Sequence, residues 1–204
     1  MYKKPVIVFE GIEGSGKTSH LNFVSKYLKE KKIRFIKIRE PGGSVNSEKI
    51  RKLILSKKSS FNKNTDLLLY LAARSENIDL FKKFYKKKVI LIDRFIDSTI
   101  AYQHFGFGIN KNLIENINDF LLDNFKVSFT FLNIVDRNNL FKRLKKRKNL
   151  NRYDKFNIKF YDKVQKGFLK LAKKSAKKYK IINSNLEINL NKQLIIKKID
   201  KLLK

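Results

Sequence analysis

One eight-residue segment constrains the fold of this chain more than any other: Gly11-Ile12-Glu13-Gly14-Ser15-Gly16-Lys17-Thr18. It matches the pattern G-x-x-x-x-G-K-[ST], in which the glycines let successive backbone N–H groups point at phosphate oxygens. The motif needs a strand before it and a helix after it. The β-rich run 6–9 precedes it, and the apolar spacing of residues 18–32 predicts a helix behind it. The segment therefore predicts a phosphate-binding loop at the end of the first strand of an α/β fold.

Three polar side chains are expected to complete this phosphate site. Lys17 would bridge the β- and γ-phosphates of bound ATP, and Thr18 would offer its hydroxyl to Mg²⁺. Asp93 ends the apolar run 89–92 and fits the role of holding Mg²⁺ directly or through water. The alternatives are a glycine-rich turn that only caps a helix and an ordinary aspartate at a strand end.

Strand-like and helical patterns alternate along the whole chain. Strands are predicted at 6–9, 33–38, 89–92, 129–134 and 180–183, and helices at 18–32, 47–55, 65–84, 97–103, 111–124, 138–148, 156–178 and 191–203. This alternation predicts a doubly wound parallel sheet of about five strands with helices on both faces and ligands at the carboxyl ends of the strands. With 204 residues, of which 42% are hydrophobic, residues 1–204 are expected to form a single domain.

The chain is strongly basic, with 48 Lys and Arg against 18 Asp and Glu. The lysines are spread through nearly every segment beside many Ile, Asn and Phe residues, a composition typical of A/T-rich genomes. Neither an RNA-binding aromatic signature nor zinc-finger spacing is present, so only weak, non-specific attraction to polyanions is expected. There is no cysteine, and the first apolar run is too short for a signal peptide or a membrane span. We therefore expect a cytoplasmic protein with no membrane partner and no specific nucleic-acid partner.

Three arginines stand at or near predicted element ends on one side of the sheet: Arg39, Arg74 and Arg94. Guanidinium groups make bidentate contacts that suit phosphate oxygens and would be wasted on a neutral nucleoside. Together they favour an acceptor that already bears a phosphate, and hence a nucleoside monophosphate kinase over a nucleoside kinase. The alternative is three solvated surface charges.

The order of motifs along residues 5–172 resembles that of thymidylate kinases. The segments that support the resemblance are Phe9-Glu10-Gly11, Arg39-Glu40-Pro41-Gly42-Gly43, Ala72-Ala73-Arg74, Asp93-Arg94-Phe95 and Ser98-Thr99-Ile100-Ala101-Tyr102-Gln103. The resemblance implies in-line transfer of the γ-phosphoryl group of ATP to dTMP, without a covalent enzyme intermediate, and a homodimer.

The resemblance also assigns roles at the acceptor. Arg39 and Arg94 would grip the dTMP phosphate, and Glu13 would lie near the sugar 3′ position and the transferred phosphate. Tyr102 would crowd the sugar C2′ position and so favour a deoxyribose.

A further group would surround the base. Tyr70 would place its ring against thymine, with plain core packing as the alternative. Arg74, Thr99 and Gln103 would contact the polar edge of the base, and a wrong base would leave such buried groups unpaired.

A mobile basic lid is expected at about residues 141–155. Some family members have an arginine inside the phosphate loop, whereas here those positions are Gly14 and Ser15. The charge that stabilises the transition state is therefore expected from lid arginines, Arg147 first among them. A solvated charge run is the alternative. The lid candidates are Arg143, Arg147 and Arg152.

Some segments depart from the family pattern. Asn183-Ser184-Asn185 is richer in amides than the segment that usually touches adenine, and Asn151 and Tyr153 replace a more acidic lid pattern. Two other functions remain open: a kinase for another pyrimidine monophosphate, and a basic binding module with an inactive phosphate loop.

Overall fold

A computed structural model describes residues 4–147 and 151–204 of the chain. Its centre is a five-stranded parallel sheet in the order β2-β3-β1-β4-β5. The strands are β1 (Val6–Glu10), β2 (Phe35–Arg39), β3 (Val89–Asp93), β4 (Phe129–Ile134) and β5 (Tyr179–Asn183). The doubly wound sheet with helices on both faces is thereby confirmed, and each predicted strand lies within two residues of its expected start.

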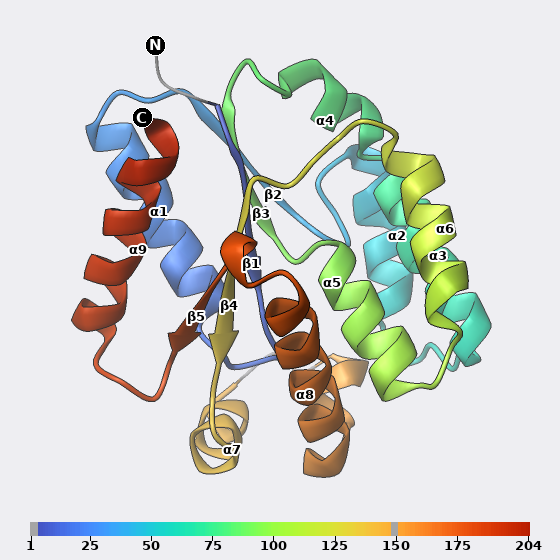
Figure 1. Ribbon diagram of the computed structural model, residues 1–204. Coiled ribbons are helices and arrows are strands. Elements are labelled where there is room, and N and C mark those ends of the chain that lie inside the picture. The colour runs from blue at the N-terminus through green and yellow to red at the C-terminus, as the bar shows by residue number, and fades with distance from the viewer. Residues whose placement is uncertain (1–3, 148–150) are drawn as a thin grey trace.

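Two helices, α1 (Lys17–Glu30) and α9 (Ile188–Leu203), cover one face of the sheet (Figure 1). Ile7 and Phe9 of β1 point into this layer, where they pack against buried residues such as Leu21 of α1 and Ile195 of α9. Alternate residues of a strand face opposite sides, so the other β1 residues face the second layer.

The second layer contains six further helices (Figure 1). They are α2 (Val45–Leu55), α3 (Lys63–Ser75), α4 (Ile78–Phe84), α5 (Ile96–Thr99), α6 (Lys111–Leu122) and α8 (Ile158–Lys174). Val8 and Ile92 pack here against Phe81 and Phe95. Burial on both faces explains why β3 is a continuous apolar run rather than an alternating one.

The single helix predicted over 65–84 is wrong, because the chain forms two helices that are interrupted at Asn77. The Asn77 side chain is fully buried and binds the loop after β2. Its Nδ2 donates to the Gly42 carbonyl at 2.8 Å, and its Oδ1 accepts from the Ser44 N–H at 3.0 Å. We attribute the break between the two helices to this buried side chain, which satisfies backbone groups of the loop. The spacing of apolar residues does not reveal such a break.

The helix expected at 97–103 is present but changes its winding. It begins as α5 and continues as a π-helical segment, η1 (Ile100–Gly106). Within it the Phe107 N–H donates to the Tyr102 carbonyl, five residues earlier, at 3.0 Å. π-Helical turns are rare and often occur at functional sites. This one bears Tyr102 and Gln103, two of the predicted acceptor residues.

The expected lid, at about residues 141–155, includes the second half of α7 (Arg137–Lys145) and a 3₁₀ turn, η2 (Arg152–Lys155). Residues 148–150, which the predicted lid includes, lie outside the described residues. In Figure 1, α7 lies below the carboxyl ends of the strands, next to the amino-terminal half of α8. A last 3₁₀ turn, η3 (Ala176–Lys178), leads into β5. Among the described residues, no helix is long and apolar enough to cross a membrane.

Candidate active site

A cavity of about 640 Å³ lies at the carboxyl ends of the strands. Its wall is formed by the ends of β2 and β3, the start of α1, the π-helical segment, α7 and the turn between β5 and α9. The structure brings nearly every predicted site side chain to this wall. Those lining it are Glu13, Lys17, Thr18, Arg39, Tyr70, Arg74, Asp93, Arg94, Thr99, Tyr102, Gln103, Arg143 and Arg147.

The phosphate loop joins β1 to α1, as the motif predicts. Gly11 has φ +139°, and a Cβ there would lie 2.2 Å from the Asn133 carbonyl oxygen of β4, so only glycine fits between the two strands. Lys17 folds back over the loop, where its Nζ donates to the Ile12 carbonyl at 2.7 Å. Burial, reinforced by the charge of Arg94, lowers the pKa of the Lys17 ammonium to about 8.

Thr18 and Asp93 meet at the carboxyl end of β3. The Thr18 hydroxyl donates to Asp93 Oδ2 at 2.7 Å. Two oxygens about 3 Å apart match adjacent positions of an octahedral Mg²⁺ shell. Among the described residues, no group of three or more Asp, Glu, His or Cys side chains could hold a metal ion. The donor set thus fits an ion that takes most of its ligands from water and substrate phosphates.

Arg94 forms the centre of a second cluster. Its backbone lies in the left-handed region at φ +67°, which turns the guanidinium toward the phosphate loop. Nη1 donates to the Gly11 carbonyl at 2.9 Å, and Nη2 forms an ion pair with Glu13 Oε1 at 2.8 Å. The other Glu13 oxygen accepts from the Tyr102 hydroxyl. Burial opposes ionisation of Glu13, but the charges of Arg94 and Lys17 outweigh it and hold the pKa of this carboxyl below its usual value.

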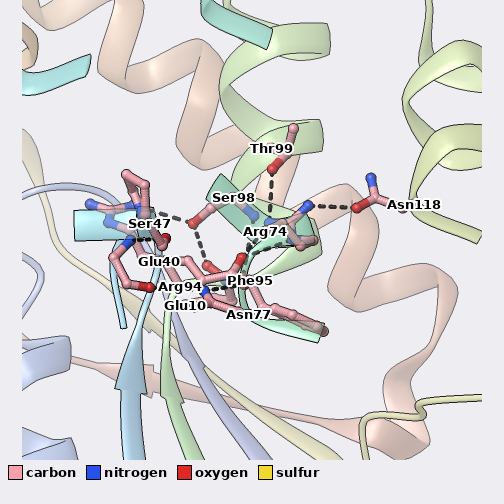
Figure 2. A network of polar contacts seen from close by, with 12 residues as sticks. Glu10, Glu40, Ser47, Arg74, Asn77, Arg94, Phe95, Ser98, Thr99 and Asn118 are labelled. Carbon is pink, nitrogen blue, oxygen red and sulfur yellow. Dashed lines mark hydrogen bonds and ion pairs between the residues drawn. The ribbon is translucent and has the colours of Figure 1, made fainter. Parts of the chain in front are cut away.

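Arg74 of α3 is more deeply buried, with a side chain only 2% exposed. Figure 2 shows the polar contacts around it. Its Nε donates to Glu40 Oε2 at 2.8 Å, its Nη1 to Asn118 Oδ1 at 2.5 Å and its Nη2 to Thr99 Oγ1 at 3.1 Å. The ion pair with Glu40 compensates for burial of both charges. Arg74 therefore fixes the position of Thr99 while it lines the cavity.

Gln103 differs from its neighbours because its polar atoms are unpaired. Both the amide nitrogen and the amide oxygen are buried and have no hydrogen-bond partner among the described residues. The side chain lines the cavity beside Thr99 and Tyr102. Buried polar groups are nearly always satisfied in native proteins, so this pair is suited to a ligand that offers one acceptor and one donor.

A third arginine cluster closes the outer rim. Arg39 forms a partly exposed ion pair with Glu48 at 2.9 Å. Arg51 of α2 also lines the cavity, with Nη1 donating to the Pro41 carbonyl at 2.6 Å. Sequence reasoning missed Arg51, although its spacing from the buried residues Ser47 and Ile54 places it on the inner face of the helix. Burial and the nearby charge of Arg39 lower the pKa of Arg51.

The three lid arginines have different positions. Arg143 bridges two loops: Nη1 donates to the Gly14 carbonyl at 2.9 Å, and Nη2 donates to the Ser184 carbonyl at 2.6 Å. Arg147 forms an ion pair with Asp154 at 2.5 Å. Arg152, in contrast, pairs with Asp66 of α3 rather than with the phosphate loop. A direct role for Arg152 at the phosphates stays a prediction.

Three tyrosine side chains line the cavity where the lid meets the rest of the protein. The ring of Tyr153 lies edge-on to those of Tyr70 and Tyr102, with both centroid distances at 6.1 Å. Burial raises the pKa values of all three hydroxyls, so the tyrosines stay neutral. Tyr153 is a second lining residue that motif reasoning did not assign to the acceptor pocket, because it lies in the segment that departs from the family pattern.

The opposite end of the cavity is formed by the turn after β5. The Ser184 hydroxyl donates to the Ser15 carbonyl at 2.6 Å and so ties this turn to the phosphate loop. Leu186, Ile188 and Asn191 line the cavity beyond it. This end is more apolar than the arginine-rich end.

The fold and the cavity together define a class of protein, the P-loop nucleotide kinases: one loop is built for phosphates, and a separate pocket is lined with arginines. Comparison with known proteins identifies the family. The family model described as Thymidylate kinase matches residues 9–195, so the likeness extends past residue 172, where the motif resemblance ends.

Individual relatives agree. The thymidylate kinase of Thermosipho africanus is 41% identical over 169 residues, covering 82% of this chain and 84% of that protein. The thymidylate kinase of Clostridium novyi is 36% identical over 194 residues, covering 93% and 95%. The crystal structure of the Ehrlichia chaffeensis thymidylate kinase superposes with a TM-score of 0.78 at 32% identity, covering 96% of this chain and 98% of that one. The chain belongs to the thymidylate kinase family and is a phosphotransferase.

Proposed function

We propose that residues 1–204 form a single catalytic domain that binds ATP in the loop Gly11–Thr18 and dTMP in the arginine-lined pocket, and that it yields ADP and dTDP. Family membership supports the reaction itself, because thymidylate kinases phosphorylate dTMP to dTDP. The observation that carries the residue assignment is the unpaired, buried amide of Gln103 on the wall of the acceptor pocket.

The base end of this pocket suits thymine. Thymine offers an imide N–H donor beside the O4 acceptor, and the Gln103 amide can pair with both. Thr99, held by Arg74, supplies a hydroxyl nearby. The Tyr70 ring gives an apolar surface for the base, and Tyr102, anchored through its hydroxyl on Glu13, limits the room beside the sugar. These contacts favour dTMP over a ribonucleotide.

The phosphate end of the pocket depends on Arg39 and Arg94, and Arg51 adds a third positive charge. Each of the first two is paired with a carboxylate that can share it with a phosphate. The Glu13 carboxylate bonds to both Arg94 and Tyr102. These contacts support a position between the acceptor pocket and the phosphate loop.

Catalysis is proposed to rest on positioning and charge, with in-line transfer and no covalent intermediate. Mg²⁺ held by Thr18 and Asp93 would neutralise charge on the ATP phosphates. Lys17 reaches the β- and γ-phosphates from the loop. Arg143, which already contacts the loop, and Arg147 stabilise charge on the transferred group. Closure of the lid around them excludes water and limits hydrolysis of ATP.

The adenine of ATP would occupy the apolar end of the cavity. Leu186 and Ile188 offer flat apolar contact to a ring, and Ser184 holds their turn against the phosphate loop. In this proposal, the amide-rich segment 183–185 contributes to the adenine site through its backbone and Ser184 rather than through its amide side chains.

A homodimer is proposed from an apolar surface on two neighbouring helices. Leu68 of α3 is 60% exposed, and Phe120 and Leu113 of α6 are 82% and 50% exposed, while α3 and α6 contact each other. Exposed apolar patches of this kind often mark protein interfaces. A cytoplasmic location and the lack of a specific nucleic-acid partner stay predictions from composition.

The test is an ADP-release assay with ATP, Mg²⁺ and each of dTMP, dUMP, UMP, CMP and dCMP in turn. We expect the highest kcat/KM with dTMP and a loss of turnover when EDTA removes Mg²⁺. A preference for another pyrimidine monophosphate would retain the kinase and refute the base contacts. Salt-dependent nucleic-acid binding without turnover would refute the enzyme altogether.

A further inference from the structure

Glu10, the last residue of β1, is a buried carboxylate that the proposed mechanism does not use. Its side chain is 0% exposed, and the residue immediately precedes the phosphate loop. Buried carboxylates are costly unless several donors satisfy them. The donors that reach Glu10 therefore show what the residue stabilises.

The donors that reach Glu10 come from two residues at the start of α5, Phe95 and Ser98 (Figure 2). Glu10 Oε1 accepts the Phe95 N–H at 2.7 Å and the Ser98 N–H at 3.3 Å. Glu10 Oε2 accepts the Ser98 hydroxyl at 2.5 Å. Phe95 is the residue before the helix, and Ser98 lies in its first turn, so Glu10 caps α5 from a neighbouring strand.

This cap also constrains Arg94, which immediately precedes Phe95. Arg94 has φ +67°, a conformation that costs a residue with a Cβ energy unless its surroundings enforce it. The Arg94 Nη1 donates to Ser98 Oγ at 3.3 Å and to the carbonyl of Gly11, the residue after Glu10, at 2.9 Å. Because the Ser98 hydroxyl proton points to Glu10, its lone pairs face Arg94.

We infer that Glu10 is a positioning residue for dTMP binding: through Phe95 and Ser98 it holds the Arg94 guanidinium in the orientation that receives the acceptor phosphate. Glu10 does not line the cavity, so we expect it to touch neither substrate. The inference rests on the acceptor-phosphate role proposed for Arg94. It predicts that loss of Glu10 affects the dTMP site more than the ATP site, although Glu10 lies next in sequence to the ATP loop.

The test compares steady-state kinetics of Glu10→Gln with a control at Ser128, which precedes β4 and bonds to the other end of β1. Ser128→Ala removes a side-chain acceptor of the Val6 N–H at the far end of β1, 3.0 Å in the native chain, and should leave both KM values unchanged. For Glu10→Gln we expect kcat/KM for dTMP to fall about tenfold, with KM for ATP within about twofold of the parent value. Ser98→Ala deletes only the hydroxyl that contacts both Glu10 and Arg94, and it should also lower kcat/KM for dTMP. This variant replaces Glu10→Gln in the test if Glu10→Gln fails to fold.

A double-mutant cycle separates this inference from the function it rests on. If Glu10 acts through Arg94, Glu10→Gln should have no further effect on kcat/KM for dTMP in an Arg94→Gln background. A full, additive effect in that background, or an equal rise in KM for ATP, would overturn the inference while leaving Arg94 as a phosphate ligand. An Arg94→Gln variant with unchanged kcat/KM for dTMP would instead refute the acceptor role of Arg94, and the inference with it.

Discussion

Replacing Arg74 by methionine should destabilise the protein far more than replacing any surface arginine. Methionine keeps the length and apolar stem of the side chain but removes every donor. Glu40, 5% exposed, would then be a buried carboxylate without its ion-pair partner, and Asn118 and Thr99 would each lose a donor. Breaking a buried ion pair from one side costs about 3–5 kcal/mol, because the remaining charge is uncompensated.

The size of this effect can be read in a thermal melt. For a chain of this length, 1 kcal/mol corresponds to roughly 2–4 °C in Tm, so we expect Arg74→Met to lower Tm by about 10 °C at pH 7. Arg39→Met is the matched control, because Arg39 pairs with Glu48 at 2.9 Å with side chains 56% and 36% exposed. An exposed pair contributes about 0–1 kcal/mol, so the control should melt within about 2 °C of the parent.

The pH dependence gives a second check on the mechanism. Burial raises the pKa of Glu40 above its ordinary 4.5 even with Arg74 beside it, and loss of Arg74 should raise it further. A carboxyl with a raised folded-state pKa binds its proton more tightly when folded, so stability falls as pH rises from 4.5 through the raised value. The Arg74→Met deficit should therefore shrink toward pH 4.5, and Glu40→Gln should partly rescue the variant. A pH-independent deficit, or one no larger than that of Arg39→Met, would refute the buried-charge argument.

Three further predictions test the phosphate site. Gly11→Ala should abolish ATP binding by calorimetry, because its Cβ would overlap a neighbouring strand, whereas Gly108→Ala, with φ +75° but open space around it, should retain binding. Affinity for ATP should weaken as pH rises above about 8, where the buried Lys17 ammonium loses its proton, and dTMP affinity measured in parallel should not follow it. Arg147→Ala should lower kcat about 100-fold with little change in either KM. Arg137→Ala removes an arginine at the start of α7 that pairs with Asp162 of α8, and it should leave kcat unchanged. A rise in KM alone would make Arg147 a docking residue.

The sequence predicts the floor of the cavity well because its positions follow from the sheet. Parallel strands end at one edge, so residues that follow β1, β2 and β3 must meet there, and the register pairs Arg39 with Asp93 and Asp93 with Phe9. The loop motif adds Lys17 and Thr18 by local spacing alone. Each of these assignments needs only the order of strands and the direction of their side chains.

The parts that sequence does not predict depend on contacts between distant segments. The break at Asn77 arises because its amide binds a loop 35 residues earlier. Arg51 and Tyr153 reach the cavity because of how α2 and the lid turn pack against it, which apolar spacing only partly reveals. The pairing of Arg152 with Asp66 spans 86 residues, and a basic run gives no indication of which of its charges will find a partner.

The acceptor pocket also shows that net charge and site charge are separate matters in this protein. The excess of 30 positive charges is spread over the sequence, and at physiological salt, charges on an exposed surface are screened beyond about 8 Å. Three arginines of the cavity, in contrast, are each paired with a carboxylate: Arg39 with Glu48, Arg74 with Glu40, and Arg94 with Glu13. The Arg74 pair is too deeply buried to open without a large cost, so a phosphate can share only the other two. Under the proposed function, selection of the acceptor therefore depends on which pairs can open. Adding surface lysines should then change the association rate and its salt dependence rather than the discrimination between monophosphates.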